Sequence, residues 1–265
     1  MSDMASGKIN IYEGKDLEGV RIAAEASALV LERTCQVVVP GISTAEIDML
    51  AAEFIKETGG KSCFLGYNGY PAHICVSINN EVVHGIGRPD RFVQPGDLVS
   101  LDVGVTIGGY CGDNARTVCA GPCSELGQML MDTTKAALDA GIEQAIEGNT
   151  INDIGSAIEH VARRAGFSVV RDMVGHGCGR RMHEPPEVPN YFIRGNSTVL
   201  KEGMILAIEP MVNVGTWRIV IDRVDGWTTR TADSSLSAHF EHQVLVKKHK
   251  AEVLTCLNKQ KTVSR

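Results

Sequence analysis

The sequence lacks any apolar run that approaches the roughly 20 residues needed to span a bilayer, so no membrane protein is expected. Its first ten residues contain no apolar signal core, which predicts a cytoplasmic protein. The only dense basic run is Lys247-Lys-His-Lys250, and the net charge is -6, so nucleic-acid-specific binding is not expected. No Pro- or Ser-rich linker divides the chain, which predicts one domain over residues 1–265.

The eight cysteines show no zinc-finger spacing. Cys119 and Cys123 form a CxxxC motif, but no second Cys/His pair stands at a suitable distance. Without an export signal the thiols are expected to be reduced, and we interpret this pair as structural.

A weak internal repeat suggests that the chain is a duplication. Gly41-Ile-Ser-Thr-Ala-Glu-Ile47 resembles Gly148-Asn-Thr-Ile-Asn-Asp-Ile154, and each stretch opens a helical pattern of apolar residues. Ser43 and Thr150 are expected N-caps, each with an acid three positions on, and Gly59 and Gly166 are expected to close the two helices. We therefore predict two pseudo-halves, about 11–120 and 121–250, with the active site between them.

Long helices are expected before each repeat, at about 16–38 and 124–147. Strands are expected after the helices, at 74–79, 98–105, 109–119, 204–209, 218–222 and 239–246. Strands that cluster after helices favour an α+β fold over an alternating α/β fold.

Asp102 lies in the middle of an apolar strand, on the face opposite Val99, Leu101 and Val103. Such a carboxylate needs a partner. If Gly108 and Gly109 form a two-residue hairpin loop, the next strand returns Asp113 to the same face. A cation would relieve the repulsion between two such carboxylates. The alternatives are that an arginine such as Arg116 pairs with one of them, or that Asp113 lies in solvent.

Three further segments add candidate metal ligands. His176 lies between glycines that free its imidazole to project into a cavity, Glu209 ends an apolar strand before Pro210, and Glu241 is expected inside another strand. Singly, each is more simply a surface charge or a hydrogen-bonded core residue. Together with Asp102 and Asp113 they make one imidazole and four carboxylates, a set that can hold two divalent cations.

In order and approximate spacing, five segments resemble the type I methionine aminopeptidases, and the likeness runs from the first helix nearly to the C-terminus. They are Leu101-Asp-Val103, Cys111-Gly-Asp113, Gly175-His-Gly-Cys-Gly179, Ile208-Glu-Pro-Met-Val-Asn213 and Phe240-Glu-His242. The resemblance implies the pita-bread fold, a duplicated α+β unit with a pseudo-twofold axis. It also implies that the metal ligands are Asp102, Asp113, His176, Glu209 and Glu241.

The resemblance implies further roles. His84 would contact the substrate amine or the scissile amide, and His183 would bond the substrate carbonyl oxygen. The methionine pocket would be lined by Cys63, Tyr67, Tyr70, Cys75 and Trp227, residues that could otherwise be ordinary core packing. Sulfur and aromatic faces suit a thioether side chain. Two positions depart from the family pattern: Met182 stands where Phe is usual, and Gly87, where Pro is usual, is expected to loosen the loop after His84.

The resemblance implies removal of the initiator methionine, with small second residues favoured. The chemistry would be amide hydrolysis by two divalent ions, with Glu209 as the proton acceptor and His84 and His183 assisting. An oxygen-rich site with one imidazole suits Mn, Fe or Co, and also Zn. We expect a monomer that binds N-terminal Met-peptides and makes a transient ribosome contact. The alternatives are a proline-specific pita-bread peptidase, a catalytically inactive binding protein on this fold, and a two-metal phosphoesterase.

Overall fold

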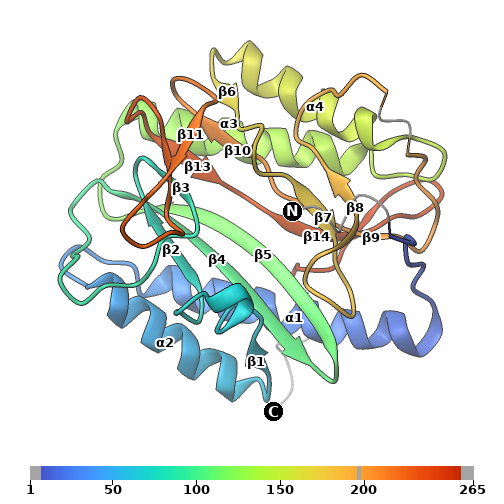
Figure 1. Ribbon diagram of the computed structural model, residues 1–265, viewed down its shortest axis with the longest axis horizontal. Coiled ribbons are helices and arrows are strands. Elements are labelled where there is room, and N and C mark those ends of the chain that lie inside the picture. The colour runs from blue at the N-terminus through green and yellow to red at the C-terminus, as the bar shows by residue number, and fades with distance from the viewer. Residues whose placement is uncertain (1–6, 196–197, 258–265) are drawn as a thin grey trace.

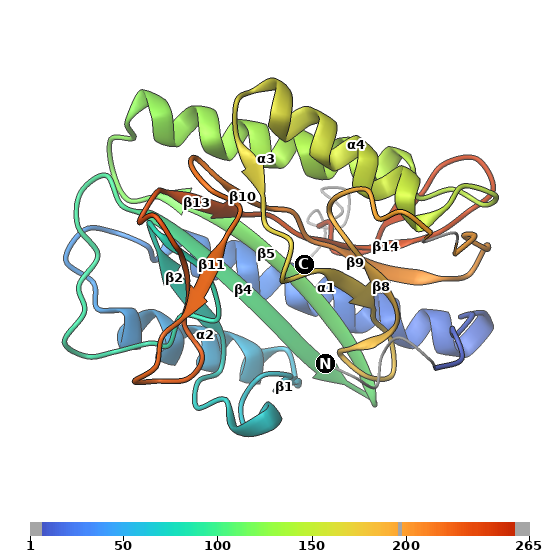
Figure 2. The same cartoon turned by 45° about the horizontal axis from the view of Figure 1, so that its top comes forward.

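The computed structural model describes residues 7–195 and 198–257, and it places strands between two pairs of helices (Figure 1). The first pair is α1 (Gly14–Gln36) and α2 (Thr44–Glu57), and the second is α3 (Glu125–Glu143) and α4 (Ile151–Arg164). After the view is turned by 45°, the two pairs still lie on opposite sides of the strands (Figure 2). Each pair precedes its own group of strands, and the predicted α+β class is confirmed.

The helix starts follow the caps expected from the sequence. The Ser43 hydroxyl accepts from the Glu46 N–H at 3.2 Å, while the Glu46 carboxylate accepts from the Ser43 N–H at 2.9 Å. At α4 the Asp153 carboxylate accepts from the Thr150 N–H at 2.7 Å. Gly59 and Gly166 follow α2 and α4 with φ of 79° and 83°, the left-handed conformation in which glycine carries no Cβ penalty.

The strands form four small sheets. In the first, β4 pairs with β1 and β2 along one edge and with β5 along the other. The other three have the strand orders β13-β10-β6, β11-β12-β3 and β15-β14-β9-β7-β8. The bounds, with a short 3-10 helix at Tyr67–Gly69, are β1 Lys61–Ser62, β2 Cys75–Ile78, β3 Glu81–Val83, β4 Leu98–Ile107, β5 Tyr110–Cys119, β6 Ser168–Val169, β7 Gly175–Gly177, β8 Glu184–Val188, β9 Ile205–Ile208, β10 Met211–Asn213, β11 Ile219–Ile221, β12 Thr229–Thr231, β13 Ser237–His239, β14 His242–Leu245 and β15 Glu252–Val253.

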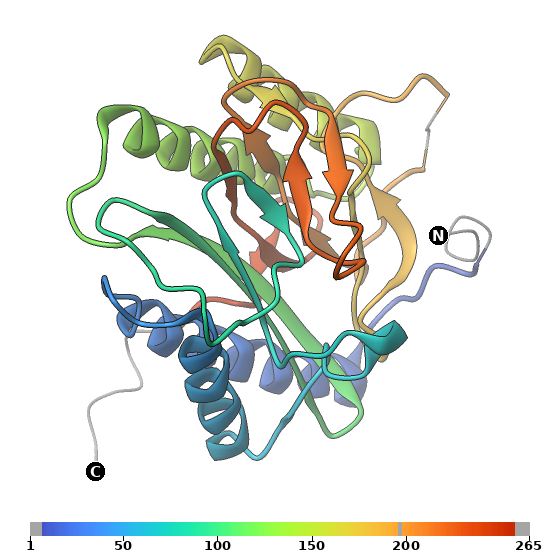
Figure 3. The ribbon, with the colours of Figure 1, turned by 60° about the vertical axis from the view of Figure 1, so that its left-hand side comes forward.

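One sheet joins strands that are far apart in sequence. β3 lies before β4 in the chain, and it pairs with β12 from the C-terminal part of the chain. Figure 3 shows β3, in teal, beside the orange hairpin of β11 and β12. This pairing brings the residues that follow β3 next to those that precede β12.

Among the described residues, the two largest apolar clusters lie between strands and helices. In the first, Val99, Leu101 and Val103 of β4 are fully buried in a cluster with α1 and α2, as the sequence pattern predicts. The second packs α3 and α4 against β8, β9 and β14. Asp102 is left on the opposite face of β4, away from the first core. Within the part of the chain that is described, no helix has both the length and the apolar character needed to cross a membrane.

Candidate metal centre

The β4–β5 hairpin brings Asp102 and Asp113 to one face. Its loop has two residues, Gly108 and Gly109, with φ of 60° and 82°, as expected for a tight hairpin. Asp113 therefore stands opposite Gly104, two residues along β4 from Asp102. Residues two apart in a strand share a face, so both carboxylates project to the same side. Asp113 is buried, which removes the alternative that it lies in solvent.

His176 is held on β7 by its two flanking glycines. A Cβ on Gly175 would lie 2.3 Å from the Ala207 carbonyl oxygen on β9, and one on Gly177 would lie 2.3 Å from the Pro185 carbonyl oxygen on β8. Only glycine permits these close approaches. The Nδ1 atom of His176 lies 3.0 Å from the Gly177 carbonyl oxygen, which can only accept a hydrogen bond. This contact assigns the proton to Nδ1 and leaves the Nε2 lone pair facing the carboxylates.

Glu209 and Glu241 occupy breaks in the sheets. Glu209 lies between β9 and β10, and the Asn190 side chain donates to its carbonyl oxygen at 3.1 Å. The prediction of one strand over residues 239–246 is wrong, because the strand is interrupted between β13 and β14 at Phe240 and Glu241. There the Glu241 N–H leaves the regular ladder and donates to the Ala115 carbonyl oxygen on β5 at 2.9 Å. The interruption joins Glu241 to the strand that carries Asp113.

The five predicted ligands lie together. Asp113, His176 and Glu241 each offer a ligand atom within 4.8 Å of the others. The Nε2 atom of His176 lies 3.4 Å from Glu209 Oε1 and 3.9 Å from Asp113 Oδ2. Three carboxylate oxygens, one each on Asp102, Asp113 and Glu241, are buried without a hydrogen-bond partner in the described part of the chain. Buried polar atoms normally have partners, and orphaned carboxylate oxygens beside an imidazole fit divalent cations.

The electrostatics of this acidic cluster also call for a cation. Burial raises the pKa of Asp102 and of Glu209 to about 7. Burial, and then repulsion from neighbouring carboxylates, raises the pKa of Asp113 and Glu241 well above the usual range. A divalent cation would favour the ionised forms and reverse this effect. The donor set therefore fits a dinuclear divalent metal centre.

An arginine does not fill this role. Arg116 instead lies 2.9 Å from Glu32 of α1. In the described ranges, 7–195 and 198–257, Asp113 and Glu209 form ion pairs with histidines and with no arginine. The arginine alternative raised by the sequence is therefore not supported.

Two further histidines lie beside this cluster. The His183 ring lies 4.3 Å from the His176 ring between centroids, and its Nδ1 lies 2.6 Å from the Tyr67 hydroxyl. Burial, together with charge repulsion from His176 and His84, lowers the pKa of His183 to about 3. Burial, and then His239, lowers the pKa of His84 to about 4. Both rings are therefore neutral at pH 7, when each has one N–H donor and one acceptor nitrogen.

A cavity of about 690 Å³ opens onto the acidic cluster. All the predicted site residues except Cys63 line it: Tyr67, Tyr70, Cys75, His84, Asp102, Asp113, His176, His183, Glu209, Trp227 and Glu241. Cys63 packs in one apolar cluster with Tyr70, Cys75 and Trp227, and its sulfur lies 3.0 Å from the Thr106 hydroxyl. The lining of the cavity thus combines the acidic cluster with aromatic rings, among which Tyr70 meets Trp227 edge to face at 5.2 Å.

Sequence reasoning missed several residues of the site. Phe64, Met173 and Met211 also line the cavity, and so does Met182, which the sequence noted only as a departure from the family pattern. His239 is buried with its Nε2 3.6 Å from Glu209 Oε2. It stands two residues before Glu241, so strand alternation could have indicated it. Met173 lies in a loop without a periodic pattern, and its place could not be read from the sequence.

Gly87 does not loosen the loop after His84. A Cβ at this position would lie 2.9 Å from the Thr44 carbonyl oxygen, so glycine allows the loop to pack against the start of α2. The next residue, Arg88, donates its N–H to the Thr44 hydroxyl at 2.8 Å. The loop is closely held at the position where the sequence suggested mobility.

Several known proteins resemble this chain in sequence. The profile of metallopeptidase family M24 matches residues 18–248. A methionine aminopeptidase of Clostridium acetobutylicum is 43% identical over 247 residues, covering 93% of this chain and 98% of that protein. The methionine aminopeptidase of Escherichia coli K12 is 40% identical over 256 residues, covering 96% of each chain.

Solved structures also resemble this chain in fold. The crystal structure of methionine aminopeptidase from Thermotoga maritima has a TM-score of 0.91 and 40% identity, covering 94% of this chain and all of that one. A prolidase from Pyrococcus furiosus has a TM-score of 0.75 at 22% identity, covering 94% of this chain and 66% of that one, and this likeness concerns the fold alone.

Proposed function

Because this chain belongs to the methionine aminopeptidases of metallopeptidase family M24, we propose that it removes the initiator methionine from new proteins. The chain is a metalloaminopeptidase with the α+β pita-bread fold. The observation that carries the proposal is the junction of the acidic cluster with the aromatic cavity. The same cavity lining offers ligands for cations and apolar and aromatic groups for a side chain.

We assign the cations to Asp102, Asp113, His176, Glu209 and Glu241. The orphaned oxygens of Asp102, Asp113 and Glu241 support this assignment, as does the Nε2 of His176, which faces Glu209 and Asp113 at 3.4 and 3.9 Å. Bound divalent cations in such a site supply Lewis-acid chemistry and lower the pKa of water. Mn, Fe, Co and Zn all suit these ligands.

The remaining groups are assigned by their position and charge. His183 is neutral and can donate a hydrogen bond to the substrate carbonyl oxygen, where negative charge develops during attack. Glu209 is assigned to take a proton from water and return it later, because its carboxylate lines the cavity and lies beside both His176 and His239. His84 is also neutral, and we assign it to the scissile nitrogen.

The methionine side chain is assigned to the aromatic wall. Tyr70, Cys75 and Trp227 line the cavity, and together with Cys63 behind them they offer polarizable sulfur and ring faces to a thioether. Tyr70 is fixed because its hydroxyl donates to the Gly85 carbonyl oxygen at 2.8 Å. A fixed pocket of this kind selects by shape. Tyr67 and His183 also line the cavity and are in contact at 2.6 Å, and we propose that this pair limits the room for the second residue and so favours small ones.

Other properties are proposed on the same basis. The chain acts as one catalytic domain built from two pseudo-halves, about 11–120 and 121–250, which is supported by the matching capped helices. N-terminal Met-peptides of nascent proteins are the substrates. We further propose that the protein is a cytoplasmic monomer and contacts the ribosome transiently.

The decisive experiment is metal-dependent release of methionine from Met-Ala-Ser by the purified protein. Asp102→Asn and His176→Ala should lose turnover and metal while keeping their circular dichroism spectra. A set of Xaa-Pro peptides provides the contrast, because related folds include prolidases. Cleavage of Xaa-Pro peptides without cleavage of Met-Ala-Ser would refute the proposal, and so would full activity of either variant at controlled metal concentration.

A further inference from the structure

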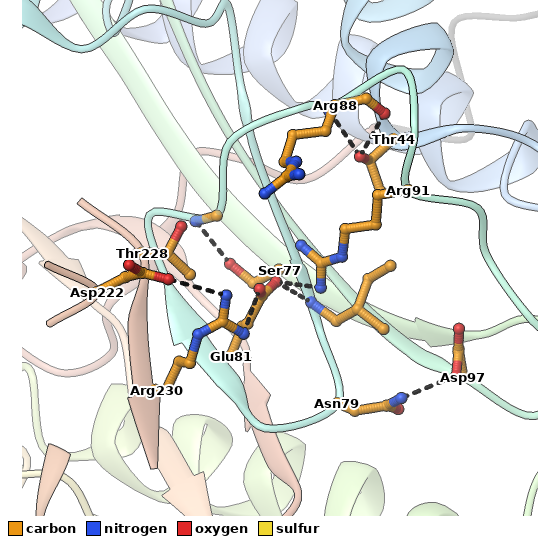
Figure 4. Close-up of polar contacts among 12 residues, drawn as sticks. Thr44, Ser77, Asn79, Glu81, Arg88, Arg91, Asp97, Asp222, Thr228 and Arg230 are labelled. Atoms are coloured by element: carbon orange, nitrogen blue, oxygen red, sulfur yellow. Dashed lines mark hydrogen bonds and ion pairs between the residues drawn. The ribbon is translucent and has the colours of Figure 1, made fainter. Parts of the chain in front are cut away.

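Glu81 is a fully buried carboxylate, with its side chain 0% exposed, and it begins the strand that leads to His84. Its Oε2 accepts from the Ile78 N–H at 2.8 Å and lies 2.5 Å from Nη2 of Arg91. Its Oε1 lies 2.7 Å from Nη1 of Arg230. Figure 4 shows the carboxylate between the two guanidinium groups.

These three contacts join three separate segments. Ile78 ends β2, Arg91 belongs to the loop after His84, and Arg230 lies on β12. Arg91 is itself anchored, because its carbonyl oxygen accepts from the Thr44 N–H at 2.9 Å at the start of α2. Arg230 also faces Asp222 at 3.4 Å, so two acids and two arginines balance in charge.

The segments joined by Glu81 carry two groups of the active site. His84 follows β3 directly and has φ of 60°, a left-handed conformation that side chains rarely adopt and that persists only where the surroundings impose it. Trp227 precedes β12 by two residues, and its ring lies 6.3 Å from that of His84 between centroids. The pairing of β3 with β12 has a register shift between Thr229 and Arg230. Backbone pairing alone therefore fixes the relative position of the two strands less strictly than a regular ladder would.

We propose that Glu81 is a positioning residue that sets His84 against Trp227 through Arg91 and Arg230. Glu81 acts through two ion pairs, which we call its two arms. The arm to Arg91 holds the loop that follows His84, and the arm to Arg230 holds the strand that follows Trp227. This inference rests on the proposed function for the roles of His84 and Trp227, but the placement of the two rings can be measured without it.

The two arms predict separable kinetic effects. His84 is assigned to the scissile nitrogen, so loosening its loop should lower kcat, whereas Trp227 is assigned to the methionine pocket, so loosening its strand should raise KM. Small displacements of reacting groups cost up to about a hundredfold in rate. We expect Arg91→Gln to lower kcat roughly tenfold and Arg230→Gln to raise KM roughly tenfold, because misplacement by a fraction of an ångström suffices. Glu81→Gln, which keeps the shape of the side chain, should do both.

The control removes an ion pair elsewhere. Glu252 of β15 pairs with Arg21 of α1, and neither residue lines the cavity. Glu252→Gln should lower the melting temperature yet leave kcat and KM within twofold of the parent, with all proteins assayed well below their melting temperatures. A second measurement uses Trp227 fluorescence in a Trp217→Phe background, where Trp227 is the one remaining tryptophan. Glu81→Gln should shift its emission to the red and increase its quenching by acrylamide.

The outcomes distinguish a failure of the proposed function from a failure of the positioning role of Glu81. If the parent does not release methionine, the proposed function fails and the fluorescence alone decides the placement of Trp227. If the parent is active and all three variants keep its kcat, KM and Trp227 emission, Glu81 serves only folding and the inference is overturned. If Glu81→Gln does not fold, the two arginine variants, which retain one ion pair each, decide the same question.

Discussion

Removal of the cations should leave Asp102 with a contribution to the stability of the folded protein that decreases as pH rises. Burial raises the pKa of Asp102 from its ordinary value of 3.8 to about 7 in the folded, metal-free chain. The folded protein therefore holds a proton that the unfolded chain releases above pH 4. The stabilisation that this bound proton gives to the folded state is fully present below about pH 4 and is lost as pH rises towards 7.

The size of the effect follows from the pKa difference. At 1.36 kcal/mol per pKa unit, a rise to about 7 corresponds to roughly 4 kcal/mol, of which about 3 kcal/mol falls between pH 5 and pH 8. For a chain of this length that amounts to about 6 °C in melting temperature. His84 and His183 act in the opposite sense, because their lowered pKa values cost stability as pH falls below about 6.5.

The assay compares thermal unfolding of the chelator-treated protein with that of Asp102→Asn between pH 5 and pH 8. The contributions of His84 and His183 are common to both proteins and cancel. Loss of the Asp102 charge also makes the raised pKa values of Asp113 and Glu241 smaller, which changes the slope of the variant in the same direction. The melting temperature of the wild type should fall by about 6 °C relative to the variant as pH rises through this range. Added divalent metal should abolish the difference in slope for the wild type, because the cation displaces the proton. Parallel slopes for the two metal-free proteins would refute the account of Asp102.

Three substitutions test other parts of the site. His183→Ala should lower kcat by roughly a hundredfold without loss of bound metal, as expected for an oxyanion donor, and steady-state kinetics with metal analysis will show whether both hold. Gly177→Ala places a Cβ 2.3 Å from the Pro185 carbonyl oxygen, so it should cost about 1–3 kcal/mol and weaken metal binding, and wild-type melting and metal content would contradict this. Gly87→Ala meets the Thr44 carbonyl oxygen at 2.9 Å and should lower the melting temperature by a few degrees; an unchanged value would mean that the loop after His84 can shift freely.

Local patterns in the sequence predicted much of this structure. The caps at Ser43 and Thr150 are short-range hydrogen bonds between residues three apart, so they can be read directly. The face of Asp102 follows from strand alternation, and the return of Asp113 follows from a two-glycine loop. Such features depend on chemistry within a few residues, so they can be predicted without any tertiary information.

The rest depends on contacts between distant segments. The expected strand over 239–246 is broken at Glu241 because the N–H of that residue donates to Ala115 on β5, a partner that no local pattern reveals. Strands as short as β3 and β12 carry too few residues to show alternation, yet they form the junction between His84 and Trp227. Glu81 was unremarkable in the sequence for the same reason, since its two arginines lie 10 and 149 positions further along the chain.

The acids of this protein illustrate two ways to keep a buried carboxylate. Glu81 is neutralised by Arg91 and Arg230, whose charges are fixed and always present. Asp102 and Asp113 have no such partner among the residues that the structure describes, and burial raises their pKa values instead. A permanent arginine pair gives a rigid joint, whereas unpaired carboxylates leave room for exchangeable cations. The fold thus places its fixed charges where strands must be held and its uncompensated charges where chemistry requires an open position.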